Sequence, residues 1–289
     1  MQDKETGRIG IFDSGYGGLT ILEGIRKVIP EYDYLYLGDN ARAPYGSRSF
    51  DIVYEFTRDA LEELFRRGCR LVILACNTAS AKALRSIQQH VLPLTYPDRR
   101  VLGVIRPTVE ILGEYTHTGH IGLVATPGTV RSHSYRMEIE KLYPEMRITE
   151  QACPMWVPLV ENNEATKPGA DYFVKKYINE IMAADPLIDT IVLGCTHYPI
   201  LLPKIKKYVP ENVRIVVQGE IVADSLKDYL HRHPELECRC TKAGRDRNPE
   251  KGGVNSGNVE YLTTENPEDF NRFASLLLND NVNSSRIIL

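Results

Sequence analysis

The chain has 289 residues, of which 43% are hydrophobic and 25% are charged, and its formal net charge is -3. This length and composition predict about two folded domains, or one large one, with a sizeable core. Without an excess of basic residues, nucleic acid is not expected as a partner.

The N-terminal segment is polar, and no run of eighteen apolar residues occurs in the chain. These features predict neither a signal peptide nor a membrane-spanning helix, so a cytoplasmic location with no membrane partner is expected. In that compartment the six cysteines are expected to be reduced thiols rather than a disulfide framework.

Short apolar runs rich in Ile, Val and Leu alternate along the chain with helical patterns. Such runs are typical of strands buried on both faces of a parallel sheet. Strands are predicted, in chain order, at residues 9–12, 34–38, 71–75, 101–105, 121–125, 190–194, 214–219 and 259–264. Helical spacing predicts helices at 51–68, 168–185, 220–230 and 267–280. This alternation predicts an α/β fold with mostly parallel sheets.

A weak internal repeat divides the chain into two related halves. "IGIFDSG" (9–15) resembles "IGLVATP" (121–127), and "LVILACNTAS" (71–80) resembles "TIVLGCTHYP" (190–199). The two matches occur in the same order, 66 residues apart in one half and 73 in the other. We therefore expect two pseudo-symmetric, doubly wound lobes. Ligands of such sheets bind beyond the carboxyl ends of strands, which predicts an active site in the cleft between the lobes.

The stretch "FDSGYGG" (12–18) places Asp13 at the end of a predicted strand, before a glycine-rich turn and a helix that begins near Leu19. A turn of this kind presents backbone N–H groups to an anion. The glycine spacing fits neither a dinucleotide fingerprint nor a P-loop. We interpret the turn as holding a small carboxylate ligand, with Asp13 beside it. The alternative is that Asp13 simply caps the helix.

The next irregular stretch, "GDNARAPYGSRS" (38–49), follows a strand and contains Asp39, Arg42, Tyr45 and Ser47. It is expected to open at the same sheet edge as Asp13. An ordinary connection between a strand and a helix is the alternative.

Two cysteines end predicted strands, each followed by polar side chains and helical sequence: Cys76 in "LACNTAS" and Cys195 in "LGCTHYP". A helix N-terminus lowers the pKa of a thiol, so both are candidate catalytic groups. The alternative is that each is a small buried hydrophobic residue. Cys69 and Cys153 lack this setting and are interpreted as structural.

Residues 231–260 are polar and rich in charge, Gly and Pro, which predicts a loop or a weakly ordered hairpin. Its HxH and CxC spacings, formed by His231, His233, Cys238 and Cys240, are the best metal candidate of the chain. Nothing else in the sequence supports a metal there.

Five segments resemble the signatures of the bacterial glutamate racemase family, in the cofactor-independent aspartate/glutamate racemase superfamily. These are "IGIFDSGYGGLTIL", "GDNARAPYGSRS", "LVILACNTASA", "ACPMWVPLVE" and "IVLGCTHYPIL". The match runs in order from residue 9 to about 230. The resemblance implies that a thiolate takes the α-proton from one face of the amino acid while a thiol returns a proton to the other.

By this resemblance Cys76 handles the proton of D-glutamate and Cys195 that of L-glutamate. Asp13 is expected beside Cys76, and His197 and Glu161 beside Cys195. The substrate-binding residues implied are Asp13, Ser14, Tyr45, Gly46, Asn77, Thr78, Thr126, Thr129, Thr196 and His197. The resemblance further implies no cofactor, neither pyridoxal phosphate nor a metal, a homodimer, and D-glutamate supply for peptidoglycan.

The chain departs from the family pattern at three places. Asn40 stands where Thr is expected, Gln218 where Asp is frequent, and Ala125 occupies the repeat position of Asp13. The last departure implies different helper groups for the two cysteines.

We expect the first lobe to comprise residues 1–104 and 222–289 and the second residues 105–221. Two other functions stay open at this point. One is a racemase for aspartate or a related acid, since the cysteine motifs do not fix the length of the substrate side chain. The other is a non-catalytic amino-acid-binding module in which both cysteines are merely packed.

Overall fold

The computed structural model describes residues 6–242 and 257–289. Its strands form two parallel sheets. The first has the order β10-β9-β2-β1-β3-β4 and consists of β1 (Ile9–Asp13), β2 (Tyr34–Gly38), β3 (Leu71–Leu74), β4 (Arg100–Gly103), β9 (Val259–Thr263) and β10 (Ser284–Arg286). The second has the order β6-β5-β7-β8 and consists of β5 (His120–Ala125), β6 (Arg147–Ala152), β7 (Thr190–Gly194) and β8 (Arg214–Val216). The expected α/β architecture is confirmed.

The two sheets repeat one topology. The run β2-β1-β3-β4 of the first sheet has the same order as β6-β5-β7-β8 of the second. In this correspondence β1 matches β5 and β3 matches β7, the pairs that the internal repeat relates. Each lobe therefore ends a matching strand one or two residues before one of the two candidate cysteines.

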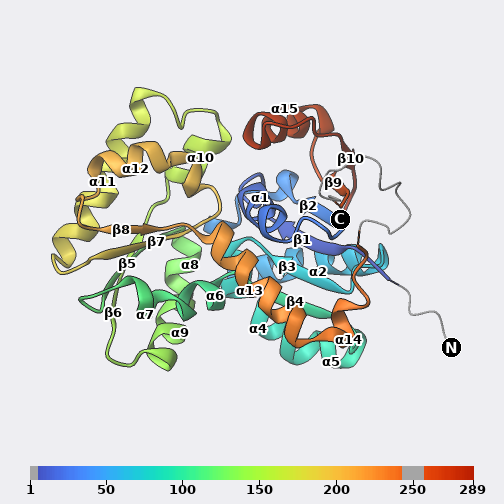
Figure 1. Ribbon diagram of the computed structural model, residues 1–289. Helices are drawn as coiled ribbons and strands as arrows, with labels where there is room; N and C mark the ends of the chain where they lie inside the picture. Colours follow the sequence, from blue (N-terminus) through green and yellow to red (C-terminus); the bar gives the residue numbers. More distant parts are fainter. Residues whose placement is uncertain (1–5, 243–256) are drawn as a thin grey trace, which may run out of the picture.

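Strand residues alternate between two buried faces of the first sheet. Ile9 and Ile11 pack with α1 (Leu19–Val28), α13 (Gln218–Arg232) and α15 (Pro267–Leu278), whereas Phe12 packs with α2 (Phe50–Arg66) and α3 (Asn77–Lys82). Helices thus cover both faces of the sheet (Figure 1). Burial on both faces explains why these strands are continuous apolar runs rather than alternating ones.

The second sheet is also covered on both faces. Its helices are α6 (Ile105–Glu110), α7 (Leu112–Tyr115), α8 (Pro127–Ser132), α9 (Ser134–Leu142), α10 (Trp156–Glu161), α11 (Pro168–Ala184) and α12 (Leu202–Tyr208). Ile121 and Leu123 pack with α6 and α9, and Val124 packs with α10, α11 and α12. The cores of the lobes therefore lie on either side of each sheet.

Helix α13 joins the lobes. It begins two residues after β8 and runs along the first lobe, where it packs closely on α1 (Figure 1). A Cβ atom on Gly24 of α1 would lie 2.5 Å from the carbonyl carbon of Gly219, so this close approach requires glycine. The expected lobe boundary at 221/222 falls inside α13 and the one at 104/105 falls before α6; both stay predictions.

Several predicted elements differ from those of the structure. Strand β6 and the C-terminal β10 were not predicted, because β6 is only partly buried and lacks a continuous apolar run. The predicted strands at 101–105 and 214–219 end at residues 103 and 216, where helices begin soon after. Helix α4 (Leu84–Ser86), a π-helical turn (Ile87–Val91) and α5 (Leu92–Thr95) follow α3.

The loop predicted over residues 231–260 is wrong at both of its ends. Residues 231 and 232 complete α13, α14 (Pro234–Glu237) follows, and β9 begins at Val259. Leu236 and Cys240 pack into the first core, which is the physical reason for order there. Residues 243–256 lie outside the described residues.

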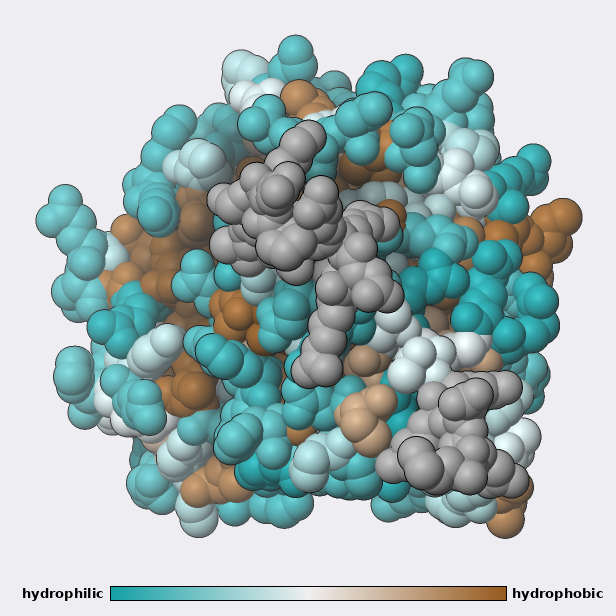
Figure 2. Space-filling model, turned by 45° about the vertical axis from the view of Figure 1, so that its right-hand side comes forward, coloured by the Kyte–Doolittle hydropathy of each residue, from teal (hydrophilic) through white to brown (hydrophobic). Residues whose placement is uncertain are grey.

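The surface that Figure 2 shows is mainly hydrophilic, with hydrophobic side chains in small groups between polar ones. Such a mixture is ordinary for folded proteins. Within residues 6–242 and 257–289, no helix combines the length and the apolar character needed to cross a membrane.

Candidate active site

Cys76 lies between β3 and α3, as the N-cap residue of that helix. Its sulfur accepts a hydrogen bond from the backbone N–H of Ala79 at 3.4 Å and lies 3.3 Å from the Ser14 hydroxyl oxygen. Burial and the nearby Asp13 carboxyl group nevertheless raise the pKa of Cys76 to about 12. The expected lowering of this pKa is therefore wrong, because burial outweighs the N-terminus of a six-residue helix.

Asp13, the last residue of β1, is fully buried. Its carboxylate accepts the Gly15 backbone N–H at 3.0 Å and the Thr196 hydroxyl at 3.2 Å, so it bonds to both lobes. Burial raises the pKa of Asp13. Asp13 also holds the turn that leads into α1, but it is not the cap of that helix, whose N-cap residue is Gly18 without a side-chain cap hydrogen bond.

The glycine-rich turn after Asp13 packs directly against the second lobe. A Cβ atom on Gly17 would lie 2.4 Å from the Thr196 hydroxyl oxygen and 2.6 Å from Nδ1 of His197. Any larger residue would therefore push the lobes apart. The glycines serve close contact between the lobes at the base of the cleft.

Cys195 directly follows β7, and its surroundings differ from those of Cys76. Its sulfur lies 3.8 Å from Nδ1 of His197, whose Nε2 lies 3.1 Å from the Glu161 carboxylate. Burial alone would lower the pKa of His197, but its hydrogen bonds to Cys195 and Glu161 raise it well above the ordinary value. The hydrogen bonds to Cys195 and Glu161 therefore favour the protonated imidazole. No α-helix starts at Cys195, since a 3₁₀ turn (Tyr198–Leu201) precedes α12.

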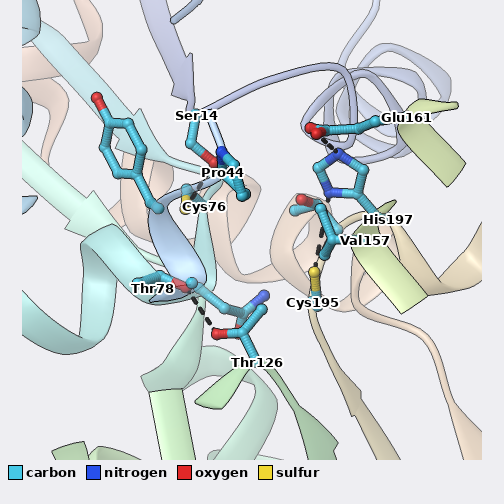
Figure 3. A pocket seen from close by; sticks show the side chains of 13 residues that line it. Ser14, Pro44, Cys76, Thr78, Thr126, Val157, Glu161, Cys195 and His197 are labelled. Atoms are coloured by element: carbon cyan, nitrogen blue, oxygen red, sulfur yellow. Dashed lines mark hydrogen bonds and ion pairs between the residues drawn. The ribbon is translucent and has the colours of Figure 1, made fainter. Parts of the chain in front are cut away.

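One pocket between the lobes contains both sulfurs, which lie on its opposite sides (Figure 3). The space between its atoms is about 310 Å³, including solvent at its mouth. It is lined by Ser14, Pro44, Tyr45, Gly46, Cys76, Asn77, Thr78, Thr126, Val157, Glu161, Cys195, Thr196 and His197. Eleven of the thirteen predicted site residues are in this set; the two outside it are Asp13 and Thr129.

Thr129 lies behind the pocket wall in a cluster of three threonines. The hydroxyl oxygen of Thr78, from the first lobe, lies 2.9 Å from that of Thr126 and 3.3 Å from that of Thr129, both from α8 and its N-cap in the second. Thr129 is fully buried and 3.1 Å from Thr126. It supports Thr126 rather than facing the pocket.

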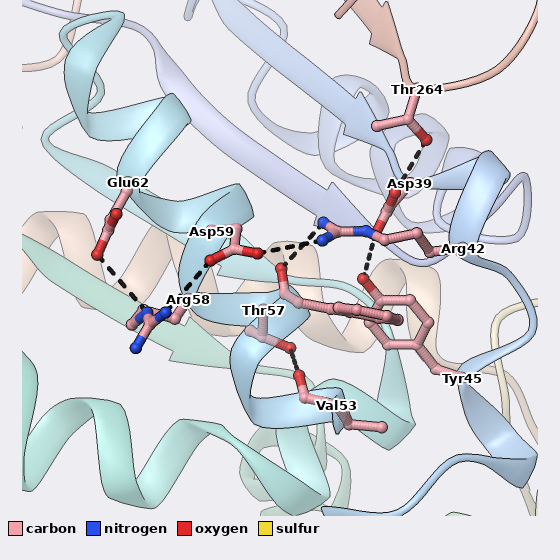
Figure 4. A network of polar contacts seen from close by, with 10 residues as sticks. Asp39, Arg42, Tyr45, Val53, Thr57, Arg58, Asp59, Glu62 and Thr264 are labelled. Atoms are coloured by element: carbon pink, nitrogen blue, oxygen red, sulfur yellow. Dashed lines mark hydrogen bonds and ion pairs between the residues drawn. The ribbon is translucent and has the colours of Figure 1, made fainter. Parts of the chain in front are cut away.

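Tyr45 lines the pocket, but its hydroxyl is directed elsewhere. The hydroxyl donates to the buried Asp39 carboxylate, which also accepts from Arg42 Nε at 2.6 Å and from Thr264 at 2.9 Å (Figure 4). This network holds the segment 40–47, which folds into two 3₁₀ turns (Asn40–Arg42 and Tyr45–Ser47). The Tyr45 hydroxyl is therefore engaged in supporting the loop.

Sequence reasoning missed Pro44 and Val157 as pocket residues, because apolar side chains carry no chemical signal. Val157 stands four residues before Glu161 on α10, so both share one helix face. That spacing could have identified it. Pro44 is adjacent to Tyr45 in the same loop.

The metal hypothesis for the HxH and CxC spacings is not supported. In the part of the chain that the structure describes, no three His, Cys, Asp or Glu side chains are grouped as metal ligands. Nδ1 of His233 lies 2.7 Å from the Tyr229 carbonyl oxygen, and Cys240 is buried with its thiol donating to the Leu236 carbonyl oxygen.

Comparison with known proteins matches this arrangement to one family. The family described as Asp/Glu/hydantoin racemase matches residues 19–226. A protein from Ruegeria pomeroyi named glutamate racemase is 38% identical over 280 residues, which cover 93% of this chain and 96% of that protein.

Two solved structures have similar folds. The glutamate racemase isoform RacE1 from Bacillus anthracis has a TM-score of 0.85 and 30% identity, and the match covers 98% of both chains. The glutamate racemase from Francisella tularensis, solved in complex with D-glutamate, has a TM-score of 0.81 and 26% identity, again over 98% of both chains.

Proposed function

Because the chain belongs to the Asp/Glu/hydantoin racemase family, we propose that it interconverts L- and D-glutamate by proton transfer at the α-carbon. The observation that carries this proposal is the pair of buried thiols on opposite sides of one pocket (Figure 3). Inversion of a carbon centre requires a base on one face and an acid on the other, and this pocket contains one thiol for each.

In the L-to-D direction, we propose that the Cys195 thiolate removes the α-proton and that the Cys76 thiol donates its proton to the opposite face. The high pKa of Cys76 suits this step, because its thiol must carry a proton when L-glutamate arrives. The His197 imidazolium, 3.8 Å from the Cys195 sulfur, provides a positive charge and a donor beside the thiolate. Glu161 holds that imidazolium in place.

In the D-to-L direction the roles are exchanged. Cys76 must then lose its proton, and the buried Asp13 carboxylate is the acceptor that we propose for it. General acid–base catalysis of this kind contributes about 10²–10⁴-fold. The remainder is expected from hydrogen bonds to the substrate carboxylates, for which Ser14, Asn77, Thr78, Thr126 and Thr196 line the pocket.

The proposed function is tested by incubating the purified chain with L-glutamate in D₂O, with a chelator and without added cofactor. Loss of the α-proton NMR signal together with formation of D-glutamate is the expected result. Exchange with aspartate but not with glutamate would show that the chain is a racemase whose substrate is aspartate. If a folded sample with reduced thiols exchanges neither acid, a non-catalytic amino-acid-binding module is the better description.

The proposal extends to physiology and assembly through the family resemblance. We propose that the D-glutamate formed supplies peptidoglycan synthesis in the cytoplasm and that the chain works as a homodimer. Light scattering at the concentration used for the activity assay tests the assembly.

A further inference from the structure

Three buried side chains, one of which lines the pocket, form a closed ring of hydrogen bonds. Nδ2 of Asn77 donates to Oε1 of Gln218 at 2.6 Å, and Nε2 of Gln218 donates to the Tyr135 hydroxyl at 2.9 Å. The Tyr135 hydroxyl donates in turn to Oδ1 of Asn77 at 2.7 Å. Each of the three side chains therefore donates one bond of the ring and accepts another.

The ring joins the two lobes. Asn77 begins α3 of the first lobe, Tyr135 belongs to α9 of the second, and Gln218 is the first residue of α13, which connects them. Asn77 is 2% exposed, Gln218 3% and Tyr135 1%. Buried polar groups at this depth are costly unless they are paired, so each bond of the ring favours this one arrangement.

Thr108 determines the direction of the ring. Its hydroxyl has one hydrogen, which it donates to the Val104 carbonyl oxygen at 2.7 Å. It must therefore accept from Gln218, whose Nε2 lies 2.8 Å away. This bond places the nitrogen of Gln218 toward Thr108 and leaves Oε1 for Asn77.

Gln218 consequently fixes the orientation of the Asn77 amide. Because Oε1 of Gln218 can only accept, the Asn77 group that faces it must be the nitrogen. The Asn77 oxygen then accepts from Tyr135, whose hydroxyl stays protonated because burial raises its pKa. Asn77 lines the pocket, so its second Nδ2 hydrogen is the one that can serve a ligand there.

We propose that Gln218 and Tyr135 are positioning residues that hold the Asn77 amide with an N–H group, not its oxygen, toward a carboxylate of the substrate. This inference rests on the proposed function, because it takes an anionic amino acid as the ligand. A flipped Asn77 would instead direct a carbonyl oxygen at the carboxylate and repel it. Gln218 is thereby given a role at a position where the family pattern differs.

The ring itself is tested without turnover, by NMR of the side-chain amides in a ¹⁵N-labelled chain. The Asn77 signal is assigned by its loss in Asn77→Ala. We expect one slowly exchanging Nδ2 hydrogen in the wild type and faster exchange with shifted signals in Tyr135→Phe. If Tyr135→Phe leaves both the shifts and the exchange of the Asn77 amide unchanged, the ring is overturned, whatever the enzyme catalyses.

The positioning role is tested by a double-mutant cycle on glutamate turnover. Tyr135→Phe and Gln218→Met are each expected to lower kcat/KM by up to about 100-fold, mainly through a higher KM, as misplacement of a binding group does. In an Asn77→Ala background the same changes should have less than about a twofold further effect, because their target is gone. Equal losses in both backgrounds would overturn the positioning role.

Thr190→Val is the matched control for lost stability. Thr190 is a fully buried threonine at the start of β7, at the opposite end of that strand from Cys195, and its hydroxyl oxygen lies 3.0 Å from Oδ1 of Asp189 and 3.3 Å from the Tyr115 carbonyl oxygen. We expect a lower Tm and an unchanged KM. If the wild type itself does not turn over glutamate, the proposed function fails, and the NMR comparison still decides the ring.

Discussion

The two sides of the cleft combine matching backbones with different electrostatic surroundings. Cys76 and Cys195 follow β3 and β7, which occupy the same place in the two sheets. Cys76 has a hydroxyl and a buried carboxyl group near it, whereas Cys195 has the His197 imidazole, which lies 3.1 Å from the Glu161 carboxylate. The repeat thus accounts for where the sulfurs lie, and the residues around them account for their different surroundings.

The repeat position of Asp13 shows how the difference arises. Asp13 ends β1, and Ala125 ends the equivalent strand β5, where it is fully buried in an apolar core. The second lobe therefore has no carboxyl group at this point. Its carboxylate comes from Glu161 on α10 and reaches Cys195 only through His197.

The largest effect is expected from replacing either cysteine, and the two replacements should have opposite effects on proton exchange. Cys76→Ala and Cys195→Ala should each lower racemisation by about 10²–10⁴-fold or more, because each removes the only acid–base group on one face. In D₂O, Cys76→Ala should retain α-proton exchange of L-glutamate and Cys195→Ala that of D-glutamate. Exposed Cys238→Ala is the control, with unchanged turnover. Full activity in either active-site variant would show that the replaced cysteine is not a catalytic acid–base group.

Glu161→Gln should disturb only the surroundings of Cys195. It removes a charged partner that raises the pKa of His197, so the alkaline limb of the pH profile of kcat/KM should move to lower pH. Loss of one charge-assisted hydrogen bond, about 1.5–3 kcal/mol, predicts a decrease of roughly ten- to a hundredfold. Glu150→Gln, whose carboxylate pairs with Arg136, is the control. An unmoved limb would contradict the role of Glu161.

The same variant should change the pH dependence of stability. The pKa of His197 is higher in the folded than in the unfolded chain, so its contribution is complete below the unfolded pKa of about 6.5. This contribution is lost as the pH rises through the folded-state pKa. Thermal unfolding between neutral and alkaline pH should show a smaller decrease in Tm for Glu161→Gln than for the wild type.

Ser14→Ala should disturb only the surroundings of Cys76, with a smaller loss of kcat/KM. The Ser14 hydroxyl opposes the effect of burial on the pKa of Cys76, so its loss should raise that pKa further. We expect kcat/KM to decrease about tenfold for a lost bond to a thiolate. The decrease in kcat/KM must be the same for L- and D-glutamate, because the two enantiomers have equal free energies and the equilibrium constant is one. The kcat values for the two enantiomers should differ. Ser80→Ala, a buried serine bonded to the Leu74 carbonyl oxygen, is the control.

Tyr45→Phe should have the smallest effect on turnover. Its hydroxyl donates to Asp39, so we expect a loss of about 1.5–3 kcal/mol of stability and less than about threefold in kcat/KM. Tyr32→Phe removes a comparable bond to Glu237 outside the site and should lose stability alone. A large increase in KM for Tyr45→Phe would show that the hydroxyl binds substrate.

Fold and site differ in how far sequence predicts them. Apolar runs predict strands buried on both faces, so β1, β2, β3, β5 and β7 were located nearly to the residue. Strand β6 is not predicted from the sequence, because its outward residues are polar and form no apolar run. The pocket residues were predicted by motif, but the pKa of Cys76 depends on burial by residues distant in the chain, which no local pattern contains.

The ring of Asn77, Tyr135 and Gln218 is not predicted either, because it depends on residues distant in the chain. Its members are 58 to 141 positions apart along the chain. The motifs identify Asn77 as a binding residue and Gln218 as a departure from the family pattern, but nothing in the sequence links either of them to Tyr135. Only the packing of α3, α9 and the start of α13 brings them together.

The order of β9 in the first sheet has a consequence for synthesis on the ribosome. Tyr34 of β2 pairs with Val259 of β9, so the edge of β2 stays open until the last part of the chain emerges. The second sheet has all its strands once Val216 is made. The later half of the repeat is thus able to fold first, while an open strand edge of the earlier half is exposed to pairing with other chains.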